Sequence, residues 1–136
     1  MEMVELLAQD GVVANLKASS KKQALQELSQ QAASLTGLHE RVIFDVLLQR
    51  EKLGTTGIGR GIAIPHGKMQ ELERLHGLFA RLPKPIDFDA IDEQPVDLIF
   101  LLLAPESAGA DHLKALARIS RLLRDDAVCE KLRGAD

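Results

Sequence analysis

Residues 96–103, which read VDLIFLLL, decide the fold of this chain. They lie between Pro95 and Pro105, and apart from Asp97 the stretch is continuously apolar. A strand with one exposed face carries polar side chains at alternate positions, whereas a strand covered on both faces is nearly continuously apolar. We therefore expect residues 96–103 to form the central strand of a sheet that is covered on both sides.

Amphipathic helices are predicted before and after this strand. Apolar residues recur at helical intervals over residues 24–35, after Ser20 at a capping-box position, and again over residues 42–47. The same periodicity returns over residues 111–125, and residues 127–133 predict a short further helix. A helical pair is thus expected before the central strand, and further helices after it.

Shorter strands are expected between the helical pair and the central strand. Residues 62–64 predict one strand, residues 75–82 a second, and residues 86–88 a short third, with Pro83 and Pro85 separating the last two. A set of strands that is preceded and followed by helices along the chain is typical of a layered α/β domain. This is the fold class that the residue pattern alone supports.

Length, composition and charge exclude several classes of protein. A chain of 136 residues is long enough for one domain with one core, and 46% apolar with 27% charged residues is an ordinary balance for a globular protein. The net charge of −3 and the lack of a basic cluster with interleaved aromatic residues argue against a nucleic-acid partner. We expect one domain that spans residues 1–136.

The remaining composition bears on the cellular compartment. Cys129 is the only cysteine, so the chain cannot build a disulfide framework or a cysteine-rich zinc site, and a reducing compartment is favoured. Residues 1–10 lack the basic and then apolar order of a signal peptide, and the longest apolar run, residues 98–104, is too short to span a membrane. We expect a cytoplasmic protein without membrane insertion.

The chemical signal is concentrated in residues 50–68, REKLGTTGIGRGIAIPHGK. Its glycines expose backbone N–H groups that can approach a phosphate closely. The candidate phosphate-loop residues are Thr56, Gly57, Gly59, Arg60 and Gly61. The segment lacks both the glycine-lysine-threonine ending of a P-loop and the dinucleotide fingerprint, so nucleotide binding is not favoured.

His66 is the candidate nucleophile of this segment. It follows the strand predicted at residues 62–64 and stands between Pro65 and Gly67, which would hold it rigidly while leaving its side chain accessible. A neutral imidazole keeps a nitrogen lone pair that can attack phosphorus. The alternative interpretation is a hydrogen-bonded histidine in a turn.

His112 and Arg50 are candidates for supporting roles. His112 opens the helix predicted at residues 111–125, and a helix N-terminus attracts anions. Arg50 ends the second predicted helix just before the glycine loop, from where a guanidinium could reach a bound oxyanion. Taken singly, a histidine placed like His112 is more often a surface or capping residue, and an arginine placed like Arg50 is more often a solvated cation at a helix end.

The segment REKLGTTGIGRGIAIPHGK resembles the active-site segment of the enzyme IIA family of the phosphoenolpyruvate-dependent phosphotransferase system, fructose/mannitol class. Within that class, TGIG, GIAIPHGK, PIDFDAIDEQPVDLIFLLLAP and DHLKALARISRLL are most similar to the nitrogen-regulatory enzyme IIA. These segments follow one another in order over almost the whole chain.

The resemblance implies a fold and an activity. It implies a mixed central sheet with helices packed on both faces, and a phosphotransferase that works through a phosphohistidine intermediate. His66 would accept phosphate from the histidine phosphocarrier protein, His112 would orient the phosphoryl group, and Arg50 would supply charge at the same site. The resemblance implies neither a cofactor nor a metal. It also implies regulation of target proteins such as transporters or kinases.

Two features depart from the family pattern. Arg60 stands where relatives often have an asparagine or an acidic residue. The extra positive charge of Arg60 would strengthen phosphate binding or change the choice of partner. Relatives also continue through a further helix beyond the position of Asp136, so a truncated C-terminus that exposes apolar surface is expected.

Three other functions remain open from the sequence. The glycine loop could hold an anionic metabolite without a covalent step, which would make the chain a binding module. The chain could be a sugar-specific enzyme IIA that passes phosphate to an enzyme IIB. His66, His112 and an acidic residue could also bind a catalytic metal, although no close HxxxH or HExxH spacing supports that reading.

Overall fold

The central strand of the protein is β6 (Val96–Pro105), as the sequence predicts. The computed structural model describes residues 7–13 and 15–134. Within these residues the sheet has six strands in the order β1-β5-β6-β3-β2, with β4 also paired to β6. The other strands are β1 (Leu7–Val13), β2 (Gly57–Gly59), β3 (Ile62–Ala63), β4 (His66–Met69) and β5 (His76–Ile86).

The sheet is mixed, with β6 at the point where the pairing changes direction. β5 runs antiparallel to β6, and β1 runs parallel to β5. On its other side β6 pairs in parallel first with β3, where Ile62 lies opposite Leu98, and then with β4, where His66 lies opposite Leu102. β3 and β4 therefore follow one another along the same edge of β6.

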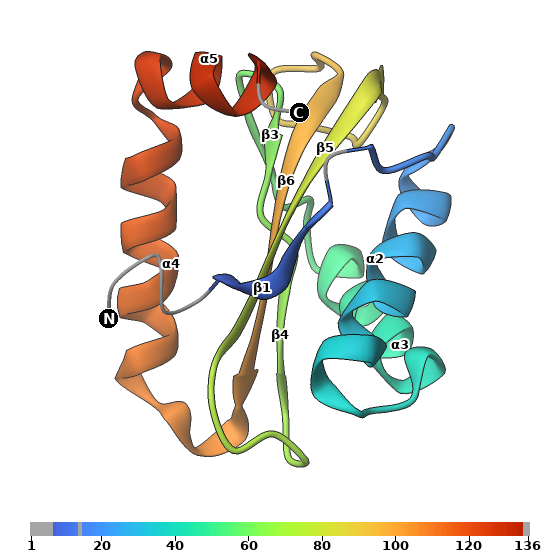
Figure 1. The fold of residues 1–136 in the computed structure, drawn as a ribbon, viewed down its shortest axis with the longest axis vertical. Coiled ribbons are helices and arrows are strands. Elements are labelled where there is room, and N and C mark those ends of the chain that lie inside the picture. The colour runs from blue at the N-terminus through green and yellow to red at the C-terminus, as the bar shows by residue number, and fades with distance from the viewer. Residues whose placement is uncertain (1–6, 14, 135–136) are drawn as a thin grey trace.

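Helices cover both faces of the sheet, as Figure 1 shows. They are α2 (Lys21–Thr36), α3 (Glu40–Lys52), α4 (Ala110–Leu123) and α5 (Asp126–Gly134), and a 3-10 turn, η1 (Glu106–Ala108), precedes α4. In this view α2 and α3 lie to the right of the sheet and α4 to the left. The expected α/β fold, a mixed sheet between helical layers, is confirmed.

The apolar run of β6 supplies both cores. Ile99, Leu101 and Leu103 belong to the cluster formed with α2 and α3, whereas Leu98, Phe100 and Leu102 belong to the cluster formed with α4 and α5. All six side chains are buried. Burial on both faces explains why the sequence of this strand does not alternate between apolar and polar residues.

Local signals at the ends of α2 agree with the sequence. The hydroxyl of Ser20 caps the helix by accepting from the backbone N–H of Gln23 at 3.2 Å. The Gln23 side chain reaches back to the N–H of Ser19 at 2.8 Å, one residue before the position that a standard capping box uses. Gly37 ends the helix with φ 78°, and its N–H donates to the carbonyl of Ala33.

The structure corrects the strand pattern between His66 and β6. The sequence predicts two strands, residues 75–82 and 86–88, but β5 is one strand that passes through Pro83 and Pro85. Its pairing with β1 ends at Ala80, so neither proline has to donate a hydrogen bond to that neighbour. On the β6 side the register shifts over the same stretch.

Three strands lie outside those that the sequence predicts, namely β1, β2 and β4. β2 and β4 have three and four residues and include glycines, so their own residues carry little strand signal. β4 is a strand because it pairs with β6, which is distant in sequence, and β2 because it pairs with β3 across the short turn that follows it. No described helix is long and apolar enough to cross a membrane.

Candidate functional site

The candidate site is built around His66, the first residue of β4. Between β3 and β4 the chain passes through Ile64 and Pro65 while it stays alongside β6, and the Pro65 carbonyl accepts from the N–H of Leu102 at 3.0 Å. The half-buried imidazole of His66 therefore stands at the beginning of a strand, rather than at the end of one as the sequence suggests. The rigid β6 pairing holds its backbone in place.

Two hydrogen bonds determine the tautomer of His66. Its Nδ1 lies 2.8 Å from the carbonyl oxygen of Ile64, which can only accept, so Nδ1 carries the proton. The Nε of Arg50 donates to Nε2 of His66 at 3.2 Å, so Nε2 carries a lone pair. The ring is therefore a neutral imidazole with Nε2 as its nucleophilic atom.

Arg50 is itself held from two sides. It lies in the last turn of α3, and its Nη1 donates to the carbonyl of Gly54 at 2.9 Å while its Nε faces His66. A guanidinium fixed in this way offers its remaining N–H groups to an oxyanion near Nε2 without further ordering. The structure thus brings Arg50 and His66 together, although they come from a helix and a strand.

His112 completes the group of side chains around His66. It lies in the first turn of α4 and is 7% exposed. Its ring centroid is 5.5 Å from that of His66, with 51° between the ring planes. Nε2 of His112 is buried and has no hydrogen-bond partner among the described residues. A buried ring nitrogen without a partner is suited to bind a polar group that enters the site.

The surroundings of both histidines favour the uncharged imidazole. Burial lowers the pKa of His66 and Arg50 lowers it further, against opposing contributions from the Ile64 carbonyl and the carboxylate of Glu51. Burial also lowers the pKa of His112, with further lowering by His66 and Lys68. Two neutral imidazoles and one guanidinium thus face each other, an arrangement that can hold and transfer an anionic group.

The first part of the glycine segment adjoins the site. Thr56 is buried, and its backbone N–H and hydroxyl both donate to the carboxylate of Glu51. Its carbonyl accepts from the N–H of Ile64 at 3.0 Å. Gly57 begins β2, where a Cβ atom would stand 2.9 Å from Cα of Ala90. Thr56 and Gly57 therefore act within the scaffold, with their backbone groups already used.

The second part of the segment, Gly59 to Gly61, lies elsewhere. Arg60 has φ 59°, its N–H donates to Asp92 at 2.9 Å, and its guanidinium lies 3.2 Å from the carbonyl of Arg124. The N–H groups of Asp97 and Leu98, at the start of β6, donate to the Gly61 carbonyl. At about 3.3 Å per strand residue, this turn is roughly 16 Å along β6 from the partner of His66. The structure does not bring Gly59, Arg60 and Gly61 to His66.

Sequence reasoning missed Glu51 and the carbonyls of Gly54 and Ile64. A signal for Glu51 was available, because it follows Ile43 and Leu47 at four-residue intervals and so lies on the buried stripe of α3. An acidic residue in such a stripe needs a partner. The two carbonyls carry no signal in the sequence, because any residue would supply the same group.

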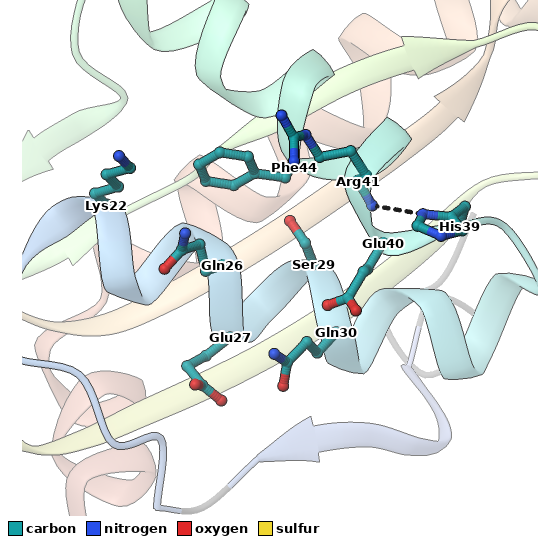
Figure 2. Close-up of a pocket in the computed structure, with 9 residues that line it drawn as sticks. All are labelled: Lys22, Gln26, Glu27, Ser29, Gln30, His39, Glu40, Arg41 and Phe44. Carbon is teal, nitrogen blue, oxygen red and sulfur yellow. Dashed lines mark hydrogen bonds between the residues drawn. The ribbon is translucent and has the colours of Figure 1, made fainter.

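One concave region lies apart from His66, Arg50 and His112. Figure 2 shows an open pocket of about 520 Å³ between α2 and α3, lined by residues of both charges, where Nδ1 of His39 accepts from the N–H of Arg41. His66 is not among the residues that line it. Among the described residues, no group of three histidine, cysteine, aspartate or glutamate side chains is placed to hold a metal ion. The metal-site interpretation therefore gains no support from the donor set.

Comparison with known proteins gives consistent matches. The sequence matches the family described as "Phosphoenolpyruvate-dependent sugar phosphotransferase system, EIIA 2" over residues 5–136. It is 64% identical over 135 residues to the nitrogen regulatory protein of Bradyrhizobium diazoefficiens, which covers 99% of this chain and 88% of that protein. For the nitrogen regulatory protein of Klebsiella oxytoca the identity is 44% over 136 residues, covering 99% and 84%. The crystal structure of Nitrogen Regulatory Protein IIA-Ntr from Neisseria meningitidis superposes with a TM-score of 0.92 at 36% identity, covering 97% of this chain and 90% of that one.

Proposed function

The chain belongs to the EIIA 2 family of the phosphoenolpyruvate-dependent sugar phosphotransferase system, and we propose that it accepts a phosphoryl group on Nε2 of His66 from a histidine phosphocarrier protein. The observation that carries the proposal is the fixed tautomer of His66. The Ile64 carbonyl accepts a hydrogen bond from Nδ1 and so keeps the proton there, and Arg50 donates to Nε2, which therefore carries the lone pair. A nucleophile with a defined attacking atom is what transfer from one imidazole to another requires.

The transfer step uses only groups that the two proteins supply. The lone pair on Nε2 of His66 attacks phosphorus, the new N–P bond forms, and the P–N bond to the donor imidazole breaks with its electron pair returning to the donor ring. The Nδ1–H remains bonded to the Ile64 carbonyl, so the phosphorylated ring keeps its proton. Because the phosphorylated ring keeps this proton, it leaves phosphorus as a neutral imidazole when the phosphoryl group is passed on, which suits a carrier.

Arg50 and His112 stabilise charge during this step. The transferred phosphoryl group spreads negative charge over its equatorial oxygens, and catalysis depends mainly on positioned cations and donors. As the N–P bond forms, Arg50 moves from Nε2 to a phosphoryl oxygen, and the buried Nε2 of His112 bonds another as an N–H donor. Thr56 and the glycines contribute through the scaffold that holds these groups.

The biological role proposed is regulation in the nitrogen-related branch of the system. Two relatives, at 64% and 44% identity, are named nitrogen regulatory proteins. The phosphorylation state of His66 would then be read by target proteins such as transporters or kinases in the cytoplasm. A sugar-specific role, with onward transfer to an enzyme IIB, is the second candidate, because the family description names a sugar phosphotransferase system.

The direct test is intact-mass analysis after mixing with a phosphorylated histidine phosphocarrier. The wild-type chain should gain one phosphoryl group, and NMR should locate it on Nε2 of His66. His66→Ala should gain none while it remains folded, and His76→Ala is the matched control that should still be phosphorylated. Wild-type protein that gains no mass, or His66→Ala that still gains it, would contradict the proposal. Onward transfer to an enzyme IIB would favour the sugar-specific role.

A further inference from the structure

Glu51 is a buried carboxylate at the end of α3, with 4% of its side chain exposed. Its Oε1 lies 2.9 Å from Nζ of Lys21 and accepts from the backbone N–H of Thr56 at 3.1 Å. Its Oε2 accepts from the Thr56 hydroxyl. A buried charge is tolerated only with such partners, and here most of them lie on a single residue of the loop.

From Thr56 two hydrogen bonds lead to the imidazole, the first between backbone groups and the second from the ring to a backbone carbonyl. The Thr56 carbonyl accepts from the N–H of Ile64 at 3.0 Å, and the carbonyl of Ile64 accepts from Nδ1 of His66 at 2.8 Å. Each backbone N–H that is held in this way belongs to the residue whose carbonyl, one peptide group further on, is the next acceptor. Glu51 is thus connected to the ring of His66 by a continuous series of hydrogen bonds.

A second connection runs through the helix end. The N–H of Gly54 donates to the backbone carbonyl of Glu51 at 3.1 Å, and the carbonyl of Gly54 accepts from Arg50 at 2.9 Å. The segment from Gly54 to Thr56 is therefore pinned at one end to Arg50 and at the other to Glu51. Movement of this segment would change the direction of the guanidinium as well as the acceptor for His66.

We propose that Glu51 is a positioning residue for phosphoryl transfer, whose carboxylate holds Thr56 so that His66 keeps its proton on Nδ1 and presents Nε2 to the donor. This inference rests on the proposed function, since His66 is taken as the phosphorylated side chain. Lys21 is the cation that makes the buried carboxylate tolerable, and it also contacts exposed Asp89 at 3.6 Å and the ring of Phe88 at 4.9 Å.

The alternative is that Glu51 only stabilises the fold, and the tautomer of His66 separates the two. Nitrogen-15 NMR distinguishes a protonated from an unprotonated ring nitrogen in the folded protein. In wild-type protein Nδ1 of His66 should be protonated and Nε2 should not. In Glu51→Leu the two tautomers should be mixed, and phosphoryl uptake at saturating donor should slow roughly tenfold to hundredfold, as expected when a reacting group is misplaced by about 1 Å.

Glu51→Gln is the conservative variant that should rescue the tautomer. Its amide oxygen can still accept from the N–H of Thr56, while its NH₂ group faces the Thr56 hydroxyl, which can then accept. Loss of the negative charge should lower the pKa of His66 further, because Glu51 raises it. The charged and titratable groups around that ring are Arg50 and Glu51 from α3 and His112 from α4.

Thr56→Val keeps the test decisive if Glu51→Leu does not fold. It removes only the hydroxyl that bonds Glu51, so a smaller shift in the same direction is expected. Glu40→Leu, at an exposed position in the first turn of the same helix, is the matched control and should behave as wild type.

Wild-type tautomer and rate in folded Glu51→Leu, or in Thr56→Val if the former does not fold, would overturn the inference. Failure of the wild-type protein to take up phosphate would instead contradict the proposed function. The tautomer populations would still test the link from Glu51 to His66.

Discussion

Gly67 on β4 packs so closely against Val46 on α3 that a Cβ atom on Gly67 would stand 2.5 Å from Cγ1 of Val46. Gly67 follows His66 directly, and Val46 precedes Arg50 by about one helical turn. The same contact between helix and strand therefore sets the separation of the two side chains that meet at 3.2 Å. Glycine is required here by the close approach of α3 to β4.

Replacement of Gly67 by alanine should move Arg50 away from His66. Val46 lies in a helix, where a β-branched side chain has one strongly preferred rotamer, so it cannot easily give way. We expect Gly67→Ala to lower the free energy of unfolding by about 1–3 kcal/mol, as overpacking does. Phosphoryl uptake should also slow. Urea denaturation and single-turnover kinetics measure the two effects.

The double variant Gly67→Ala with Val46→Ala is the control for this contact. Removal of Cγ1 of Val46 leaves room for the new methyl group, so much of the loss in stability and rate should be recovered. Losses that simply add in the double variant would show that the contact does not set the geometry of the site.

The sequence predicts the main elements because their signals are local or depend on burial. The apolar run of residues 96–103 shows a strand covered on both faces, and the periodicity of residues 24–35 shows an amphipathic helix with its cap. β1 and β4 are not predictable in this way, since pairing with distant strands creates them, and the three residues of β2 are too few and too rich in glycine to give a strand signal. The continuous β5 is missed because Pro83 and Pro85 signal a break unless one knows that β1 does not pair there.

The site is predictable only in part, for similar reasons. His66 stands out because proline and glycine flank it, and its pairing with Leu102 gives it a rigid backbone. The sequence cannot show that Arg60 lies beside Arg124, because the turn that carries it folds toward α5. Nor can it show that the Ile64 carbonyl sets the tautomer of His66, because backbone carbonyls are the same at every residue.

The pH dependence of stability follows from the lowered pKa values of His66 and His112. An unfolded chain has both imidazoles at their ordinary pKa of 6.5, so between the folded and unfolded values it binds more protons than the folded chain. These groups should leave stability unchanged well above pH 6.5, reduce it as pH falls from 6.5 toward the folded pKa values, and cause no further loss below them. Urea denaturation at about pH 7.5 and about pH 5.5 measures the loss.

The variant for comparison combines His66→Gln with His112→Gln. It lacks both buried imidazoles, so its stability should fall less between the same two pH values. An equal fall of the free energy of unfolding in the variant and in the wild type would show that other groups cause the acid sensitivity.

His112→Ala should slow phosphoryl uptake without abolishing it. The covalent bond forms on His66, whereas His112 contributes one donor to the phosphoryl oxygens from a buried position 5.5 Å away between ring centroids. Loss of one such donor costs roughly a hundredfold in rate. His112→Gln retains an N–H donor and should recover part of the rate. Phosphoryl uptake by His112→Ala at the wild-type rate would show that His112 does not contribute to transfer.

Gly61→Ala should destabilise the protein without affecting phosphoryl uptake. Gly61 has φ 80°, and a Cβ atom there would stand 2.7 Å from Nη2 of Arg133 and 2.8 Å from Oδ1 of Asp97, which form an ion pair between α5 and β6. The control is Gly37→Ala, because Gly37 has φ 78° with no atom within 4 Å of its added Cβ. It carries only the backbone strain of about 1–2 kcal/mol.

The difference in unfolding free energy between these two variants measures the contact with α5. We expect Gly61→Ala to lose roughly 1–2 kcal/mol more than Gly37→Ala. Its rate of phosphate uptake at saturating donor should equal that of the wild type, because the turn lies at the far end of β6. A slower rate of phosphate uptake in folded Gly61→Ala would contradict this prediction and show that the glycine turn contributes to the phosphate site.

Arg50 and Arg60 flank the same glycine segment, yet they should affect transfer differently. Arg50 is held by Gly54 and contacts His66, so Arg50→Ala should slow the step at saturating donor and raise the pKa of His66, which Arg50 lowers. Arg50→Lys should recover little, because an ammonium group cannot reproduce the planar fork that bonds Gly54 and faces the phosphoryl group together.

Arg60 is expected to have almost no effect on the chemical step. Its guanidinium is largely exposed and lies near Asp126, 3.4 Å from the carboxylate, at the end of the sheet opposite to His66. The distance along β6, roughly 16 Å, exceeds the screening length of about 8 Å at physiological salt. Single-turnover rates of Arg50→Ala and Arg60→Ala at low and high salt test this division. A slow Arg60→Ala at saturating donor, or an Arg50→Ala with the rate and His66 pKa of the wild type, would contradict it, because each result would require a charge arrangement around Nε2 other than the one in this structure.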